Sequence, residues 1–351
     1  MQLRDPDSNL VARFTDGTTI MPQTIPDTMR AAAINRFGGV DEFKLQSIPM
    51  PEIGLDDVLI RVESVGVGVW DRWEREGAFA ALFRERHGVE PRFPYVIGFD
   101  GAGVVAAVGA DVSGFKVGDR VYADRHINPK GGFYAEYAAV KADFVSPIPG
   151  NLTVEEAGAM PVDAITALLG LDETLRLSQG ETLVIFGAGG GLGHLAVQLA
   201  KRMGVRVFAV ASGEDGAALA RRLGADAAVN GRQQDVVKAA RDFAPGGLDA
   251  ALLTAGGEAA QHALKAVRDG GRVAYPRGVK PEPKVRPSLT VKEYVGDEAD
   301  RGVFEMLNRL IAADPFTVHV ARTFALAQAA EAHRALDEHY LGKLALRLPG
   351  G

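Results

Sequence analysis

Short apolar runs alternate with helical patterns in the second half of the chain. Thr182–Phe186 is a nearly continuous apolar run typical of a buried strand, and residues 192–203 carry apolar positions at the spacing of one helix face. Repetition of this order predicts a parallel sheet covered by helices on both faces. The pattern also predicts strands at 205–211, 248–255, 272–275 and 289–295, and helices at 213–223 and 259–267.

The residues from 29 to about 150 have a different rhythm. Apolar β runs at 58–62, 101–108 and 120–123 follow one another closely and are separated by Gly, Pro and Asp. Short strands with such turn signals are typical of a barrel-like β domain. Helical spacing over 154–171 marks the change to the second half.

The pattern after residue 300 returns the chain to its first half. Helices are expected at 303–312 and 326–336, followed by a closing strand at 344–348. That strand has no partner in a completed strand–helix–strand sheet, so we assign it to the β-rich domain. The chain is therefore expected to be an α/β protein with three parts. These are an N-terminal extension (1–28), a β-rich domain (29–150 and 300–351) and a doubly wound parallel-sheet domain (151–299).

Composition excludes several classes of protein. The 351 residues are 47% hydrophobic and 24% charged with a net charge of −6, so no positive field would attract nucleic acid or anionic lipid. No apolar run reaches the roughly 18 residues of a membrane span, and the N-terminus lacks a secretory pattern, which predicts a cytoplasmic protein. Cysteine is absent, which removes disulfides, thiol nucleophiles and cysteine-ligated zinc.

The glycine-rich segment 187–193 (GAGGGLG) lies between a predicted strand and a predicted helix. In dinucleotide-binding turns one small residue makes the tight turn, a second lets the pyrophosphate approach, and a third lets helix pack on strand. Ala188, Gly190 and Gly193 match these roles, although the first is usually glycine. The pyrophosphate would lie on the helix N-terminus, at Gly191 and Leu192. The alternative is a glycine-rich loop without a ligand.

The end of the next strand favours NADP(H) over NAD(H). An NAD site usually carries an acidic residue there, which bonds the ribose 2′-hydroxyl. Here the strand ends at Ser212, which can donate to a 2′-phosphate, and Arg221 and Arg222 are the nearest cations downstream. Glu214 and Asp215 follow at once, so the alternative cofactor stays open.

Six segments resemble, in order, landmarks of the medium-chain dehydrogenase/reductase superfamily. They are MRAAA (29–33), SVGVGVWD (64–71), IGFDGAGVV (97–105), VGDRVY (117–122), GGFYAEY (131–137) and GKLALRL (342–348). Within that superfamily the chain is most similar to the zinc-independent quinone oxidoreductase branch. The resemblance implies a GroES-like catalytic domain, a Rossmann domain and a homodimer. Residues 78–93 look longer than is usual in the family.

The resemblance also implies that no zinc is bound. Zinc-dependent members hold the metal with a Cys, a His-Glu pair and a second Cys, and the matching positions here are Gly68, Phe99-Asp100 and Val162. Gly, Phe and Val cannot coordinate zinc, and the seven histidines form no close ligand pair. His333 and His339, near the end of a predicted helix, are expected at the surface.

Without a Lewis acid, the reaction must suit a hydride donor alone, as with quinones or α,β-unsaturated carbonyls. Thr166 matches a family threonine near the nicotinamide, with helix packing as its alternative role. Asp71 and Arg75 match positions near the active-site floor, or form a structural ion pair. Candidates to stack on an aromatic acceptor, or to be core residues, are Trp70, Trp73 and Tyr134.

The function predicted is zinc-independent, NADPH-dependent hydride transfer to quinones, with a small-molecule quinone or enone as the expected partner. An alkenal or enoyl-thioester reductase is the alternative within the same chemistry. A non-catalytic NADP(H)-binding sensor is the alternative from another class, motivated by Gly68, where many quinone reductases carry asparagine.

Overall fold

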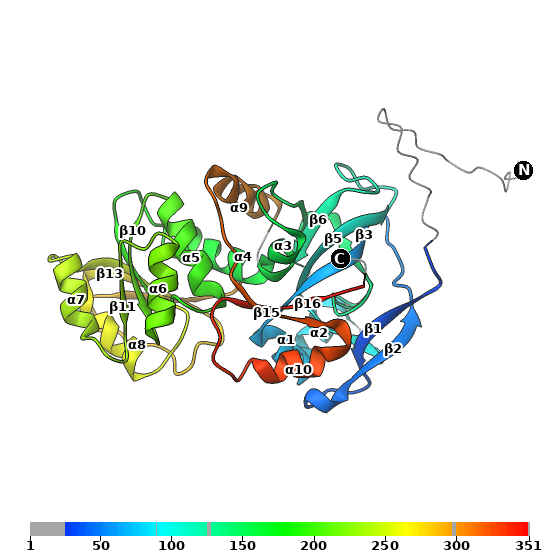
Figure 1. Ribbon diagram of the computed structural model, residues 1–351, viewed down its shortest axis with the longest axis horizontal. Helices are drawn as coiled ribbons and strands as arrows, with labels where there is room; N and C mark the ends of the chain where they lie inside the picture. Colours follow the sequence, from blue (N-terminus) through cyan, green and yellow to red (C-terminus); the bar gives the residue numbers. More distant parts are fainter. Residues whose placement is uncertain (1–24, 89, 125–127, 297–299, 350–351) are drawn as a thin grey trace, which may run out of the picture.

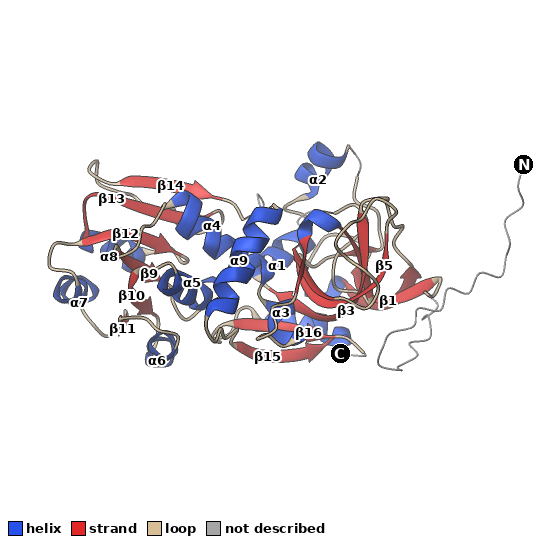
Figure 2. Cartoon of the chain, turned by 90° about the horizontal axis from the view of Figure 1, so that it is seen from above, coloured by secondary structure: helices blue, strands red, loops and turns tan. Residues whose placement is uncertain are grey.

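The computed structural model describes residues 25–88, 90–124, 128–296 and 300–349 (Figure 1). Most of the expected N-terminal extension, residues 1–24, lies outside these ranges. The described chain forms a parallel-sheet half and a β-rich half, with α4 (Pro161–Leu169) and α9 (Arg301–Ala313) between them (Figure 2). None of the described helices is both long enough and apolar enough to cross a membrane.

The second half contains the doubly wound parallel sheet that the sequence predicts. Six strands run in the order β11-β10-β9-β12-β13-β14, and every pairing is parallel. Their bounds are Ala227–Asn230 (β11), Arg206–Ala211 (β10), Thr182–Phe186 (β9), Leu248–Leu253 (β12), Val267–Pro276 (β13) and Thr290–Tyr294 (β14). The helices that follow the strands are α5 (Gly191–Arg202), α6 (Glu214–Arg222), α7 (Val236–Phe243) and α8 (Glu258–Ala263).

Successive residues of β9 enter different cores, because side chains alternate across a strand. Leu183 and Ile185 pack with α4, α5 and α9, whereas Val184 packs in a second cluster with residues of α7 and α8. Both faces are therefore apolar, which explains why the sequence of β9 is a continuous apolar run.

The first half combines a seven-stranded sheet with a three-stranded one. The larger has the order β15-β16-β3-β5-β6-β8, with β7 also paired to β3, and the smaller has the order β2-β1-β4. The strands are Thr28–Ile34 (β1), Phe43–Pro49 (β2), Asp57–Val67 (β3), Tyr95–Val96 (β4), Asp100–Val108 (β5), Arg120–Asp124 (β6), Tyr137–Lys141 (β7), Val145–Pro147 (β8), Val320–Ala325 (β15) and Lys343–Arg347 (β16). Its helices are α1 (Val69–Arg75), α2 (Ala80–His87), α3 (Val154–Ala159) and α10 (Ala329–Ala335).

The closing strand is confirmed as part of the β-rich half. β16 pairs antiparallel with β3, with Leu344 opposite Val67. Other elements differ from the prediction. The helix expected over 154–171 is split at Pro161, which begins α4, and the pattern missed β11, α7 and β15.

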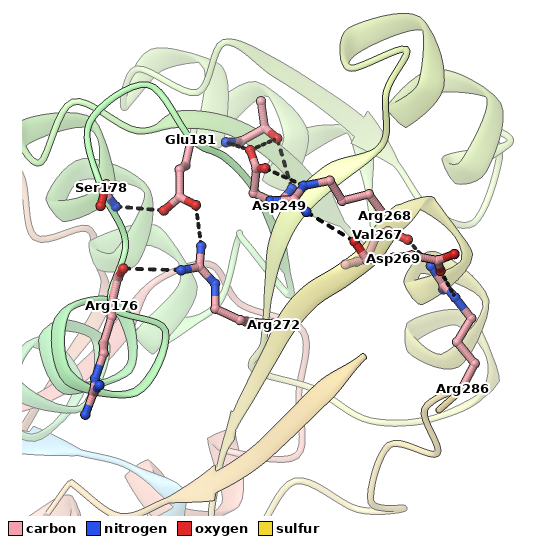
Figure 3. Close-up of polar contacts among 10 residues, drawn as sticks. Arg176, Ser178, Glu181, Asp249, Val267, Arg268, Asp269, Arg272 and Arg286 are labelled. Atoms are coloured by element: carbon pink, nitrogen blue, oxygen red, sulfur yellow. Dashed lines mark hydrogen bonds and ion pairs between the residues drawn. The ribbon is translucent and has the colours of Figure 1, made fainter. Parts of the chain in front are cut away.

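A polar network ties the amino ends of the parallel strands together (Figure 3). The Asp249 carboxylate accepts from the backbone N–H of Thr182 at 2.7 Å, from its hydroxyl at 2.8 Å and from Nε of Arg268 at 2.8 Å. Arg272 pairs with Glu181 at 2.5 Å. These contacts pair the polar groups at the amino edge of the sheet. Ligands bind at the opposite edge in this architecture, which is formed by the carboxyl ends of the strands.

Candidate active site

A cavity of about 630 Å³ lies between the two halves. It is bordered by the segments that follow β9, β10, β12 and β13, by α1, and by the chain just before β16. The carboxyl edge of a doubly wound sheet is the expected place for a ligand. Eight of the residues singled out in the sequence line it: Trp70, Asp71, Trp73, Thr166, Gly190, Gly191, Leu192 and Ser212.

The glycine turn brings backbone N–H groups to this cavity. Helix α5 begins at Gly191, and its N-cap, Gly190, supplies no side-chain cap. A Cβ on Gly193 would lie 2.1 Å from the carbonyl oxygen of Gly187, so helix and strand approach as closely as the motif requires. Ala188 is fully buried beneath the turn. The uncapped helix N-terminus fits a pyrophosphate, because its N–H groups and dipole favour an anion.

Lys343 brings a buried positive charge to the same turn. The backbone N–H of Gly342 donates to the carbonyl oxygen of Gly189 at 2.9 Å, which places Lys343 beside the start of α5. Its ammonium donates to the Asp163 carboxylate. Burial disfavours the ammonium, but Asp163 and Asp100 hold the pKa of Lys343 above its usual value. The sequence analysis did not single out this lysine, although it lies in the GKLALRL segment.

Ser212 lies at the cavity, but Arg221 does not. The Arg221 guanidinium donates to Glu214 at 2.7 Å and to the carbonyl oxygen of Ala228 at 2.8 Å, outside the cavity lining. Arg232, in the loop after β11, lines the cavity beside Ser212 instead. Because β11 was missed in the sequence, the loop that carries Arg232 was missed with it.

Thr166 carries an unpaired polar atom at the cavity. Its Oγ1 is buried and has no hydrogen-bond partner among the described residues. A Cβ on Gly296 would lie 2.1 Å from this oxygen, so the backbone after β14 closes around it. A buried hydroxyl left without a partner is costly unless a ligand satisfies it. This fits a position beside a carboxamide such as that of nicotinamide.

Asp71 and Asp100 form a buried acidic floor. Asp71 accepts from the N–H groups of Gly68 at 2.8 Å and Phe99 at 3.1 Å, and Asp100 accepts from that of Val162 at 2.9 Å. Burial raises the pKa of Asp71 to about 8, with a contribution from the nearby Asp100 carboxylate. Burial likewise raises the pKa of Asp100 to about 7. Burial and the second carboxylate therefore both favour the protonated form of Asp71.

Arg75 and Tyr134 lie outside the cavity lining and meet at His333. Arg75 and Tyr134 contact opposite ring nitrogens of His333, each at 3.0 Å. His333 was expected at the surface but is fully buried, which corrects that expectation, whereas His339 is exposed and contacts Asp215 at 2.7 Å. Tyr134 is also fully buried and is stacked on Phe43 at 6.0 Å between ring centroids, so it is a core residue in this structure.

Aromatic rings line the cavity near α1. Trp70 and Trp73 meet edge to face, with ring centroids 5.0 Å apart, and Trp70 is stacked on Phe79 at 6.0 Å. Phe79 in turn meets Phe99 at 5.6 Å. Phe79 belongs to the segment 78–93, so part of that segment supports the wall from behind.

The part of the chain that the structure describes contains no group of three or more His, Asp or Glu side chains arranged to hold a metal ion. The positions matched to the zinc ligands of the family, Gly68, Phe99-Asp100 and Val162, all line the cavity, and of these only Asp100 has a side chain with a ligand atom.

A parallel sheet with a glycine turn, joined through a cleft to a β-rich half, defines a pyridine-nucleotide-dependent oxidoreductase. Residues 54–150 match the family described as the alcohol dehydrogenase GroES-like domain, and residues 191–293 match the family described as zinc-binding dehydrogenase. The chain belongs to the medium-chain dehydrogenase/reductase superfamily, as its sequence landmarks suggested.

Named relatives share this assignment. The chain is 34% identical over 297 residues to a 2-methylene-furan-3-one reductase of Solanum lycopersicum, covering 83% of this chain and 72% of the relative. It is 34% identical over 249 residues to a quinone oxidoreductase of Sus scrofa, covering 70% and 72%. The solved quinone oxidoreductase from Coxiella burnetii superposes with a TM-score of 0.77 at 25% identity, covering 91% of this chain and 99% of that one. The protein is therefore an oxidoreductase enzyme, and the non-catalytic alternative is not retained.

Proposed function

We propose that the protein reduces quinones with NADPH and without zinc. The observation that carries this proposal is that Trp70 and Trp73 lie on the same cavity as Thr166 and the glycine turn. A flat conjugated acceptor can stack against such a wall. Its own conjugation delocalises the charge that a hydride brings, so no metal is needed to polarise it. The quinone oxidoreductases among the relatives support the same reaction.

The cofactor is held by residues that differ in what they recognise. The N–H groups at Gly191 and Leu192, together with the Lys343 ammonium, bind the pyrophosphate, whereas the N–H of Gly190 donates to the carbonyl oxygen of Gly187 at 3.1 Å and shapes the turn. Ser212 and Arg232 bind the 2′-phosphate, and this is why we favour NADP(H). Arg221 has no part in this, because its guanidinium is paired with Glu214. When bound, the reduced nicotinamide supplies the hydride.

The remaining residues orient the reactants and supply a proton. Thr166 offers its unpaired hydroxyl to the carboxamide and so fixes the face that the nicotinamide presents. Asp71 holds a proton at the cavity floor and gives it to the acceptor oxygen as negative charge develops there. Arg75 is a positioning residue, since it donates to the carbonyl oxygen of Gly38 at 3.0 Å and holds α1 in place.

A second candidate is the reduction of an alkenal or enone. The 2-methylene-furan-3-one reductase among the relatives is named for a conjugated ketone, and the same charge delocalisation applies to both acceptors. We also propose, from the family resemblance and from composition, that the protein is a cytoplasmic homodimer. Size-exclusion chromatography with light scattering tests the oligomeric state.

NADPH oxidation with 1,4-benzoquinone or a 2-alkenal, and NADP⁺ reduction with ethanol, test the function. We expect turnover with the quinone and none with ethanol in the presence of NADP⁺. A clear preference for the alkenal would promote the second candidate. Turnover of ethanol that is abolished by prolonged chelation would contradict the zinc-free mechanism.

A further inference from the structure

The ring of Trp73 touches the backbone of Gly278 across the cavity. Trp73 belongs to α1 in the β-rich half, and Gly278 follows β13 in the parallel-sheet half. A Cβ built on Gly278 would lie 2.1 Å from Cη2 of Trp73 and 2.7 Å from Cζ3. Only glycine fits there without displacement of the indole. Both residues line the cavity, so the contact closes one part of it.

Each partner is held firmly within its own half. On the Trp73 side, α1 is anchored by the Glu74 carboxylate, which accepts from the Tyr95 hydroxyl at 2.8 Å and from the Gly98 N–H at 3.1 Å. The Trp70 ring supports the indole from one side. On the other side, Gly278 has a φ of +100° in a turn closed by the Val279 N–H on the carbonyl oxygen of Pro276. The backbone on both sides of the contact is therefore anchored, and the contact changes mainly through movement of the indole itself.

The space that remains for an acceptor is small. Pockets for a single drug-sized ligand span about 300–1,000 Å³. The cavity of about 630 Å³ has to hold a dinucleotide as well as the acceptor. Trp73 is one of the aromatic residues of the cavity lining, so its contact with Gly278 limits the room for the tail of a long acceptor at the aromatic end.

We propose that the contact between Trp73 and Gly278 is a size filter, which admits compact conjugated acceptors and excludes those with a long alkyl or acyl-thioester tail. This inference rests on the proposed function, because it presumes that the acceptor is reduced in this cavity. It separates quinones and short enals from enoyl thioesters, which the sequence left as alternatives.

Fluorescence tests the contact without any turnover. The chain has two tryptophans, so Trp70→Phe leaves Trp73 as the only one. In that background, Gly278→Ala should increase quenching of Trp73 by acrylamide, because the added methyl group displaces the indole. Gly257→Ala is the matched control: Gly257 has a φ of +103°, but a Cβ placed on it would meet nothing within 4 Å, so it adds the same backbone strain without a clash. Equal quenching in the two variants would overturn the contact.

Kinetics test the filter. The ratio of kcat/KM for 1,4-benzoquinone to that for 2-decyl-1,4-benzoquinone should be high in the wild type and fall by at least about tenfold in Trp73→Ala. Trp73→Phe, a smaller change to α1 packing, should shift the ratio in the same direction. But-2-enal and but-2-enoyl-CoA form a second pair with the same expectation. An unchanged ratio in folded Trp73 variants would overturn the filter.

The two proposals fail in different ways. If the wild type reduces no acceptor, the proposed function is wrong. The size filter is then tested by the binding of the two quinones to the wild type, measured from the quenching of tryptophan emission. Tighter binding of benzoquinone than of the decyl quinone supports the filter, and equal affinity overturns it.

Discussion

The guanidinium of Arg75 donates a hydrogen bond of 3.0 Å to Nδ1 of His333 between α1 and α10. Arginine can only donate, so Nδ1 carries no proton and the neutral ring is protonated at Nε2. Nε2 therefore donates to the Tyr134 hydroxyl oxygen, also at 3.0 Å. The three residues form a buried chain of hydrogen bonds that links α1 to α10. The imidazole has to remain neutral for both hydrogen bonds to persist.

Acid should weaken the fold through His333. Burial lowers the pKa of His333 to about 3, with help from the Arg75 and Arg72 charges. The unfolded chain, with an ordinary histidine pKa near 6.5, then binds a proton that the folded chain refuses. This contribution is complete above pH 6.5 and is lost as the pH falls toward 3, at up to about 1.4 kcal/mol per pH unit.

Urea unfolding of the wild type and His333→Gln between pH 4.5 and 7.5 measures this effect. Gln keeps an acceptor for Arg75 but does not titrate. The free energy of unfolding of the His333→Gln variant should therefore depend less steeply on pH than that of the wild type. His194, whose pKa burial lowers to about 4, is present in both proteins and cancels in the comparison. Parallel pH profiles would show that His333 is not the source.

Cofactor choice should depend on Ser212 and Arg232. Ser212→Asp places a carboxylate where we expect the 2′-phosphate, and Arg232→Ala removes a cation from it. Each change should raise the Kd for NADPH by about tenfold while leaving that for NADH nearly unchanged, since a hydrogen bond to a charged group contributes about 1.5–3 kcal/mol. Titration of nicotinamide fluorescence measures both constants. Arg221→Ala is the control and should change neither, because Arg221 lies outside the cavity lining.

Lys343 should contribute to the binding of both cofactors alike. Removal of its charge weakens the pyrophosphate contact, which NADPH and NADH share, so the Kd for each should rise by about tenfold or more. Because Lys343→Met alone leaves the half-buried Asp163 carboxylate without its partner, the double variant Lys343→Met/Asp163→Asn is the better protein to measure. A rise in the Kd for NADPH alone, with the Kd for NADH unchanged, would place Lys343 at the 2′-phosphate instead.

Thr166 should affect turnover more than cofactor affinity. Thr166→Val keeps the shape of the side chain and removes the buried hydroxyl, which has no partner among the described residues. If the hydroxyl orients the nicotinamide, kcat should fall by about tenfold or more, while the Kd for NADPH changes by less than about threefold. Thr166→Ser restores the hydroxyl and should recover most of the turnover. Equal loss of kcat in the Val and Ser variants would indicate a packing role.

Local signals in the sequence identified the glycine turn and the closing strand. Thr182–Phe186 is apolar on both faces, and the strand at 344–348 had no partner in the parallel sheet. β15 escaped notice because its residues are mostly half-buried, so polar and apolar positions do not alternate clearly. The site residues that were missed share a different cause. Arg232 and Lys343 line the cavity only because distant segments meet there, and no local pattern encodes that meeting.

The hydrogen bond from Gly342 to Gly189 also constrains the order in which the molecule matures. The glycine turn at 187–193 is synthesised before residues 339–343, which supply one wall of its cavity and emerge after every described strand except β16. A nascent chain with a complete parallel sheet therefore still lacks the buried ammonium of Lys343. If Lys343 binds the cofactor as we propose, cofactor binding waits for this long-range pairing, and a premature stop that removes it would leave a well-formed sheet with an incomplete pocket.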